Sequence, residues 1–474
     1  MERTELAVAD MDATELAELI EKGTITSRKA VELYIEQLEK INPAVNCLVE
    51  NRFEEALAEA DEADRRIAAN KAEGKLLGVP ISMKEAFHVK GMQTTGGLLH
   101  RKGMVQSTDA EVVQRLKSEG AILLGKTNTP ELCFCQETDN KLYGRTNNPW
   151  DLTRTAGGSS GGEAALIAAG GAAAGFGSDI GGSIRFPSHF NGVIGFKSGK
   201  GQVSSFGSYP KESHELQRRM LGIGPIVKSV RDARLIYNIA AKVPAEEKNL
   251  ENFTINILPE TGYPLSLETA HFLDSIYASS KELFKMKPEV PPYFRETSAI
   301  WQEIMSIDGA NGAAKEAFGS RPVRPYRTYL KEKATGKADL HRYLSWALIG
   351  ASLFKPSEKR LKEIENIIVS GDEELEVYLE NQILVFPVYH RAAPKHGEVY
   401  KEIFSIKKTY LSYMPYIAYA NVWGLPALTV PVGKDGDGMP IAVQIISKNG
   451  NEDALFAFGE WLETNFPAYE RAEV

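Results

Sequence analysis

The sequence is poor in cysteine, with only Cys47, Cys133 and Cys135 among its 474 residues. Three thiols cannot form the disulfide framework of a small secreted protein, and such sparse use is typical of a reducing compartment. The first residues, MERTELAVAD, lack the basic and apolar segments of a signal peptide. These absences predict a cytoplasmic protein.

Long apolar runs and an excess of positive charge are also missing. No apolar run reaches the roughly 18 residues that a transmembrane helix needs. The 55 basic and 63 acidic residues give a formal net charge of -8, so no global positive charge is available to neutralise phosphates. We therefore expect no membrane span and no nucleic-acid partner.

The remaining composition predicts one folded domain over residues 1–474, because no repeat or low-complexity linker divides the chain. Residues 1–73 have helical periodicity, which predicts N-terminal helices. We expect one helix over 11–21, a second from an N-cap at Ser27, and a third over 52–73.

From residue 76 the sequence pattern changes. Residues 76–205 alternate strand-like runs such as GVPISMK and AILLGKT with helical segments, an α/β pattern. Within it, the small-residue stretch 164–177 predicts a buried helix. Residues 242–396 are mostly helical and predict a variable substrate region, whereas 415–474 return to strand-like runs that rejoin the sheet.

Glycine is concentrated where two serine clusters occur, with 13 of the 41 glycines between Gly157 and Gly199. The first cluster, TAGGSSGGEAAL, holds Ser159 and Ser160, and the second, GSDIGGSIRFPSHF, holds Ser183. Successive glycines let backbone N–H groups converge on a negative oxygen. Ser183 would then be placed to attack a carbonyl, and a glycine turn packed on the sheet is an equal alternative.

The first cluster also matches G-x-S-x-G, the nucleophile elbow of α/β-hydrolases, with Ser160 as the nucleophile. That chemistry needs an acid and a histidine later in the chain. The downstream histidines stand in no distinctive triad context: His189, His214, His271, His341, His390 and His396. A phosphate-binding loop is weaker still, because no Lys-Ser/Thr pair follows the glycines.

A lysine, Lys84, ends the apolar run GVPISMK. A lysine in such a place is usually a surface residue with a buried stem. A buried amine, however, loses its proton far below its ordinary pKa and can serve as a base.

Together, GVPISMKEAFHVKG, TAGGSSGGEAA and GSDIGGSIRFPSHFNGVIGFK resemble the motifs of the amidase signature family of hydrolases. The three motifs recur in the family's order, with 75 positions from Lys84 to Ser159 and 24 from Ser159 to Ser183. The resemblance spans almost the whole chain. It implies an α/β/α sandwich with a large mixed β-sheet covered by helices on both faces.

The resemblance also implies a Ser-Ser-Lys triad without metal or cofactor. Ser183 would be the nucleophile, Ser159 a bridging serine after a cis peptide bond, and Lys84 the base. The oxyanion would be held by the N–H groups of Ile180, Gly181, Gly182 and Ser183. The supporting residues would be Ser160, Asp179 and Arg185.

One segment departs from the family's pattern, since Ser198 and Gly199 follow Lys197 where the family usually has Pro-Thr. We expect a looser loop there and a changed pocket wall. By resemblance, Cys133, Phe134 and Cys135 would line the acyl pocket; a metal site at the two thiols is disfavoured because no further ligand lies at suitable spacing.

The stretch SDIGGSIRFPSHFNGV resembles the fatty-acid amide hydrolase branch of the family more than the amidotransferase branch. The resemblance thus predicts an amidase for small-molecule amides with an apolar acyl or aryl group, acting as a monomer or homodimer. A glutamine-hydrolysing amidotransferase subunit, an esterase using Ser160, and a catalytically silent scaffold are the alternatives. The apolar stretch 341–354 is a lid, an interfacial helix in peripheral membrane contact, or a core helix.

Overall fold

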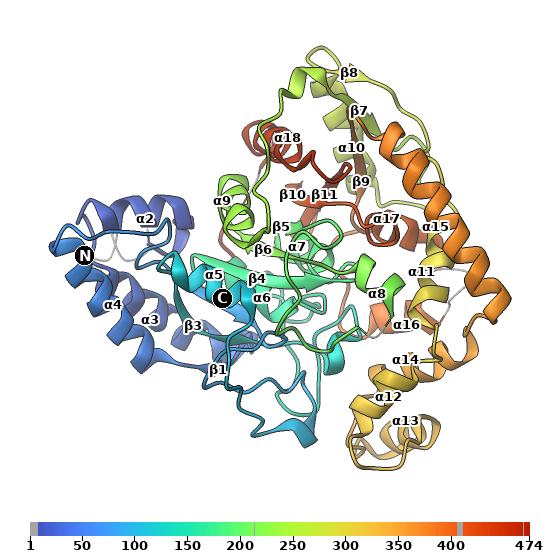
Figure 1. The fold of residues 1–474 in the computed structure, drawn as a ribbon, viewed down its shortest axis with the longest axis horizontal. Helices are drawn as coiled ribbons and strands as arrows, with labels where there is room; N and C mark the ends of the chain where they lie inside the picture. Colours follow the sequence, from blue (N-terminus) through green and yellow to red (C-terminus); the bar gives the residue numbers. More distant parts are fainter. Residues whose placement is uncertain (1–7, 213, 405–410, 468) are drawn as a thin grey trace.

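The computed structural model describes residues 8–212, 214–404, 411–467 and 469–474. A mixed sheet of 11 strands runs through it in the order β1-β3-β2-β4-β6-β5-β10-β11-β9-β7-β8 (Figure 1). The strands are β1 Leu48–Asn51, β2 Pro80–Lys84, β3 Ile122–Thr127, β4 Ala174–Asp179, β5 Ile194–Lys197, β6 Gly222–Val227, β7 Thr254–Ile257, β8 Lys285–Met286, β9 Gln382–Pro387, β10 Ala427–Lys434 and β11 Pro440–Ile446.

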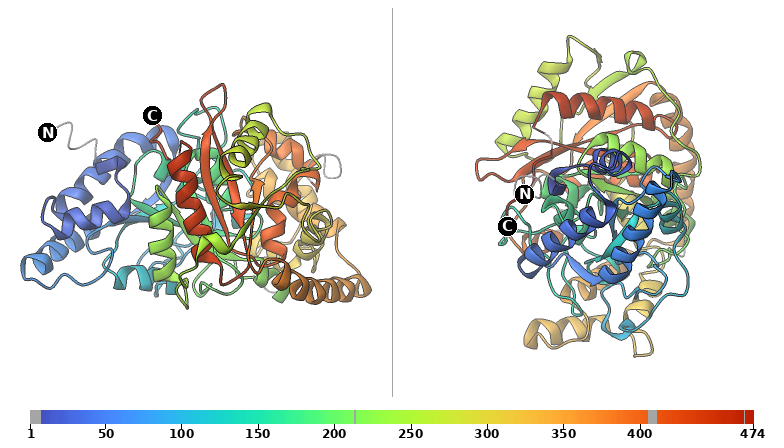
Figure 2. Two further views of the ribbon diagram at one scale, coloured as in Figure 1. Left: turned by 90° about the horizontal axis from the view of Figure 1, so that it is seen from above. Right: turned by 90° about the vertical axis from the view of Figure 1, so that its left-hand side faces the viewer.

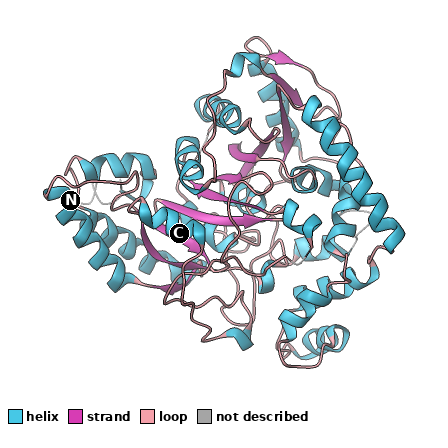
Figure 3. Cartoon of the chain, viewed as in Figure 1, coloured by secondary structure: helices cyan, strands magenta, loops and turns pink. Residues whose placement is uncertain are grey.

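Helices lie on both sides of this sheet (Figures 1 and 2), and Figure 3 shows the strands enclosed between them. The α-helices are α2 Ala13–Glu21, α3 Ser27–Val45, α4 Phe53–Ala68, α5 Glu111–Ser118, α6 Gly161–Ala168, α7 Arg185–Asn191, α8 Glu215–Met220, α9 Val230–Ala240, α10 Leu267–Ser280, α11 Thr297–Met305, α12 Asn311–Phe318, α13 Pro325–Thr335, α14 Arg342–Leu353, α15 Glu358–Tyr378, α16 Glu398–Phe404, α17 Leu411–Val422 and α18 Glu452–Asn465. Short 3-10 helices are η1 Leu99–Arg101, η2 Glu131–Cys133 and η3 Leu250–Asn252.

The helical layers pack against the apolar faces of the sheet. Helix α7 packs on β10 and β11, while α9 and α18 pack on each other and on β6 and β10. Every residue of β6 and β11 is buried, as expected for strands covered on both faces. The predicted α/β/α architecture with a large mixed sheet is confirmed.

The N-terminal helices differ from the predictions at their ends. Helix α3 has its N-cap at Thr26, not Ser27, because the extended Thr26 accepts the Lys29 N–H with its side chain. Helix α4 ends at Ala68, short of the predicted residue 73, and Asn70 then takes a left-handed φ of 54°.

The predicted buried helix over 164–177 is wrong in its second half. Helix α6 stops at Ala168, and Gly170 turns the chain with a φ of +74°. The chain continues as β4 from Ala174. Small residues suit this strand because a Cβ on Gly175 would collide with the buried Glu163 side chain.

The segment 242–396 is more than a helical addition. It holds α10 to α15, but β9 pairs antiparallel with β11 and β7 pairs parallel with β9. Runs TINI and QILVFP supply these strands, and most of their residues are buried. The prediction that strands after 415 join the sheet is confirmed by β10 and β11.

Candidate active site

The pairing of two parallel strands brings the site together. Strand β2 ends at Lys84, and β4, which pairs with it at Ile81 and Ala174, ends at Asp179. Parallel strands present their carboxyl ends at one edge of a sheet, where ligands of α/β proteins bind. Ser183 follows β4, and Ser159 lies just before α6.

Lys84 is buried and hydrogen-bonded to two serines. Its Nζ lies 2.8 Å from Ser159 Oγ and 3.1 Å from Ser178 Oγ. Ser178 lies within the second serine cluster, but no role was predicted for it; the pairing of β2 with β4 places it beside Lys84. A strand serine carries no sequence signal for this role.

Burial lowers the pKa of the Lys84 amine, because the charged form loses its hydration. A contact with the Cys133 side chain raises it and offsets part of the effect, and the charge of Asp179 acts in the same direction. The buried carboxyl of Glu163 also raises the pKa of Lys84, and burial raises the pKa of Glu163 itself to about 7. Lys84 therefore has an environment suited to a neutral amine.

The backbone around Ser159 is closely held. The Gly158–Ser159 peptide bond is cis, as the resemblance implied. Thr129 Oγ1 donates to Ser159 O at 2.9 Å. A Cβ on Gly162 would lie 2.4 Å from Asn128 N, so the turn into α6 admits only glycine there.

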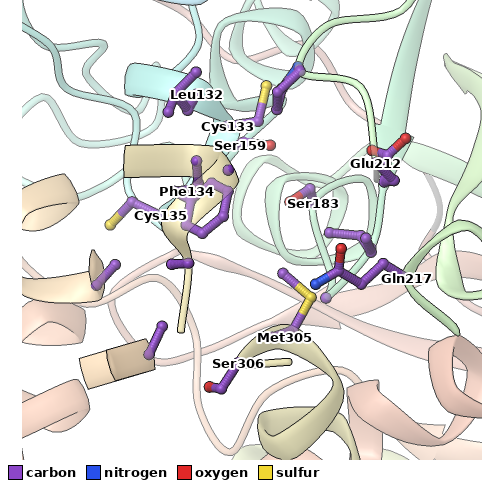
Figure 4. Close-up of a pocket in the computed structure, with 18 of the residues that line it drawn as sticks. Leu132, Cys133, Phe134, Cys135, Ser159, Ser183, Glu212, Gln217, Met305 and Ser306 are labelled. Carbon is purple, nitrogen blue, oxygen red and sulfur yellow. The ribbon is translucent and has the colours of Figure 1, made fainter. Parts of the chain in front are cut away.

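Ser159, Ser178 and Ser183 line the same cavity, and Figure 4 labels Ser159 and Ser183 at its wall. Among the described residues, Lys84 is hydrogen-bonded to Ser159 and Ser178, but no hydrogen bond joins Ser159 to Ser183. Such bonds are often long in free enzymes and tighten when substrate binds.

The loop before Ser183 is anchored by a fully buried ion pair. Asp179 accepts hydrogen bonds from Arg185 Nε and Nη2, each at 3.0 Å. Although burial opposes ionisation, the Arg185 guanidinium holds the pKa of the Asp179 carboxyl well below its usual value. The two predicted supporting residues thus fix the start of α7.

The oxyanion donors need one correction. Gly182 N donates to Asp179 Oδ1 at 2.8 Å, so this amide is occupied by the carboxylate of its own loop. Ile180, Gly181 and Ser183 lie at the cavity wall. The hydrogen bonds of the described residues include none from the backbone N–H groups of these three residues, which stay the predicted oxyanion donors.

A tryptophan that the sequence reasoning missed covers this loop. Trp301 Nε1, from α11, donates to Ile180 O at 2.8 Å. A Cβ on Gly181 would lie 2.6 Å from the same indole ring. Trp301 is distant in sequence and lies in no motif, so only the fold reveals its role.

Ser160, predicted as a supporting hydrogen-bond group, forms its hydrogen bond at the site through its backbone N–H. Its N–H donates to Ser183 O at 3.0 Å. Its buried Oγ has no hydrogen-bond partner among the described residues. The α/β-hydrolase alternative, with Ser160 as the nucleophile, therefore lacks a described base hydrogen-bonded to Ser160.

The cavity has a volume of about 380 Å³ and mostly apolar walls. Cys133, Phe134 and Cys135 line it, where the resemblance placed them (Figure 4). Helix α14, within the stretch 341–354, contributes Trp346 and Ala351 to the wall. The remaining apolar walls include Leu132, Leu221, Met305, Ala347 and Phe354.

The segment at Ser198 corrects the expectation of a loose loop. Ser198 is buried, its Oγ accepts the Ile223 N–H at 3.1 Å, and Gly199 N donates to Gln202 Oε1 at 2.6 Å. Neither Ser198 nor Gly199 lines the cavity. The departure from the usual sequence therefore lies outside the cavity wall.

The described residues lack two kinds of feature. They contain no cluster of three or more His, Cys, Asp or Glu side chains arranged for a metal ion. None of their helices combines the length and apolar character that crossing a bilayer requires.

The family model described as Amidase matches residues 29–456. The chain belongs to the amidase family. It is 32% identical to a fatty-acid amide hydrolase 2-B of Danio rerio, over 96% of this chain and 89% of the relative. It is 30% identical to one chain of the glutamyl-tRNA(Gln) amidotransferase of Trichodesmium erythraeum, over 90% and 93% of the two chains.

A solved 6-aminohexanoate cyclic dimer hydrolase has the same fold as this amidase-family chain, with a TM-score of 0.82. The two are 25% identical, and the match covers 98% of this chain and 99% of the other. The family assignment confirms the resemblance in the three motifs. It makes the chain an amidase, an enzyme of a family of amide hydrolases.

Proposed function

We propose that the chain hydrolyses carboxamides with an apolar acyl or aryl group through an acyl-enzyme on Ser183. The main observation in support is the 2.8 Å hydrogen bond between the buried Lys84 Nζ and Ser159 Oγ, in the cavity that Ser183 also lines. The apolar walls, with Phe134 and Trp301, suit an apolar acyl or aryl group.

The reaction needs no histidine. Neutral Lys84 takes the Ser159 proton while Ser159 takes that of Ser183, whose oxygen forms a bond to the amide carbon. Amides of Ile180, Gly181 and Ser183 hold the resulting oxyanion, and one such donor is worth roughly 3 to 4 kcal/mol of barrier. The relay then runs backwards, the C–N bond breaks and the amine leaves with the proton.

Water completes the cycle by the same relay. It attacks the ester carbon of the acyl-enzyme while its proton passes toward Lys84. Collapse of the second tetrahedral intermediate breaks the bond to Ser183 Oγ, which regains a proton. The products are a carboxylate and an amine, or ammonia.

A fluorophosphonate probe followed by peptide mass spectrometry tests this assignment. We expect a label on Ser183, lost in Ser183→Ala and strongly slowed in Lys84→Ala. Ser160→Ala is the matched control for the adjacent serine cluster and keeps the label. A label on Ser160 would establish the esterase alternative instead, and no label would favour the silent scaffold.

A glutamine-hydrolysing component of an amidotransferase is the second candidate, supported by the similarity to the Trichodesmium protein. The cavity favours the first, because its walls are mostly apolar and glutamine offers them no apolar group. Release of ammonia from glutamine, with no turnover of apolar amides, would reverse this order.

Location and assembly complete the proposal. We infer a cytoplasmic enzyme, in agreement with three cysteines that are all unpaired. A monomer or homodimer, and peripheral membrane contact through 341–354, remain predictions. Leu353, 74% exposed at the end of α14, is where such contact would be made.

A further inference from the structure

We propose that Glu212 selects amides that carry an ammonium group, which it receives as an ion pair inside the substrate cavity. The inference rests on the proposed function and narrows its substrate class. It adds a cation to the apolar group already assigned to the substrate. The ammonium group would sit on the acyl part or on the leaving amine.

Glu212 differs from the other acids of the cavity. The carboxylates of Asp308 and Glu316 also line it, but each has a protein partner. Asp308 Oδ2 accepts the Gly312 N–H at 2.7 Å, and Glu316 Oε2 accepts the Tyr209 hydroxyl at 3.1 Å. Among the described residues, the carboxylate of Glu212 is hydrogen-bonded to its own backbone N–H and to no side chain.

Glu212 lies in the same cavity as the proposed reacting groups. It lines the cavity together with Ser159 and Ser183, and Figure 4 labels all three around it. Its carboxylate interacts electrostatically with Lys84 and with Arg218. A substrate held at Ser183 therefore extends within the electrostatic range of this acid.

The charge balance of the cavity favours a cation. Its described lining contains three carboxylates and, as the basic residue, Lys211, which is exposed. Lys84 is assigned as a neutral base. Burial raises the pKa of Glu212 to about 7, and its own backbone N–H and the charge of Arg218 offset this only in part, so the ionised carboxylate lacks full compensation in the free cavity. A substrate ammonium group would supply it.

The polar side chains near Glu212 do not replace such a cation. Gln217 Nε2 donates to Ile304 O at 3.1 Å, and Gln302 Nε2 donates to Ser306 Oγ at 3.2 Å. Both amides line the cavity but direct donors to the protein. Neither amide therefore neutralises the carboxylate of Glu212, which can accept a ligand.

Two pairs of matched amides test the inference by turnover. The first pair is 5-aminopentanoyl and hexanoyl p-nitroanilide, and the second is N-(4-aminobutyl)- and N-pentylbenzamide. Each pair exchanges an ammonium group for a methyl group of similar size. We expect the kcat/KM ratio, ammonium over methyl, to exceed one for at least one pair and to fall about 10- to 100-fold in Glu212→Gln.

Two further variants guard against trivial causes. Glu212→Asp keeps the charge and should restore part of the ratio, which a folding defect would not do. Glu215→Gln removes the same charge from an exposed position of α8 and should keep the ratio. An unchanged ratio in Glu212→Gln for both pairs would overturn the inference.

Calorimetry separates this inference from the proposed function, because it needs no turnover. Pentylammonium chloride should bind the wild-type enzyme more tightly than pentan-1-ol, and Glu212→Gln should abolish that difference. If no amide is hydrolysed but this difference is seen, the proposed function fails and the ammonium site stands. If amides are hydrolysed but Glu212→Gln keeps the difference, the ammonium site fails.

Discussion

The carboxylate of Asp179 and the guanidinium of Arg185 form a two-point ion pair, and both side chains have no solvent exposure. The pair lies under the loop that holds Ser183. Its oxygens also accept the N–H groups of Gly182 and Ile184. The ion pair therefore fixes the backbone from which Ser183 projects.

Removal of one partner of the Asp179–Arg185 ion pair should destabilise the folded protein. We expect Arg185→Met to lower the free energy of unfolding by about 3–5 kcal/mol, because it leaves Asp179 as an uncompensated buried carboxylate. Urea denaturation followed by circular dichroism measures the change. Arg65→Met breaks an exposed pair with Glu62 and should cost at most about 1 kcal/mol. Equal losses in both variants would contradict this account.

The pH dependence of hydrolysis should respond to Cys133. Lys84 must be neutral to act as a base, so kcat/KM rises with pH through the pKa of Lys84. The Cys133 side chain raises that pKa, so Cys133→Ala should move the acid limb of the profile to lower pH. Cys47→Ala removes a buried thiol outside the cavity and should leave the midpoint in place. A shift to higher pH in Cys133→Ala would refute the assignment.

The two adjacent serines should behave differently on substitution. Ser159→Ala removes the partner of Lys84 and should reduce kcat by at least about 100-fold, in the range of general-base catalysis. Ser160→Ala removes a buried hydroxyl that has no hydrogen-bond partner in the described part of the chain, and it keeps the backbone N–H. The unfolding free energy should therefore change by less than about 1 kcal/mol. Steady-state kinetics and thermal unfolding of both variants decide the point.

Trp301 should act as a positioning residue for the oxyanion loop. We expect Trp301→Ala to lower kcat by about 10- to 100-fold, because loss of the ring over Gly181 and of the bond to Ile180 O lets the donors move. Trp301→Phe keeps a ring but loses the bond, and should retain more of kcat than the alanine variant. Separate values of kcat and KM are needed, since Trp301 also lines the cavity. A change confined to KM would limit its role to substrate contact.

The sequence predicted the parts of the site that are local in the chain. Lys84 ends an apolar run, and the two serine clusters carry glycines that the backbone requires, so motif and spacing could identify Lys84, Ser159 and Ser183. Ser178 could not be found in this way, because its contact with Lys84 depends on the pairing of β2 with β4.

The fold was predicted in class but not in every element. The small residues of 164–177 suit a buried helix or a buried strand equally well, and Gly170 divides them between α6 and β4. The strands β7 and β9 lie in a mostly helical region, and their place in the sheet follows from long-range pairing. Such pairing leaves little trace in a short apolar run.

Lys84, the proposed base, ends strand β2, and Ser183, the proposed nucleophile, follows strand β4, whereas much of the cavity wall comes from α11 and α14. Chemistry and selectivity are thus encoded in separate stretches of the chain. Substitutions in the helical stretches can change which amide enters without disturbing proton transfer. A lineage built on this plan can acquire new substrates while it inherits its reaction intact.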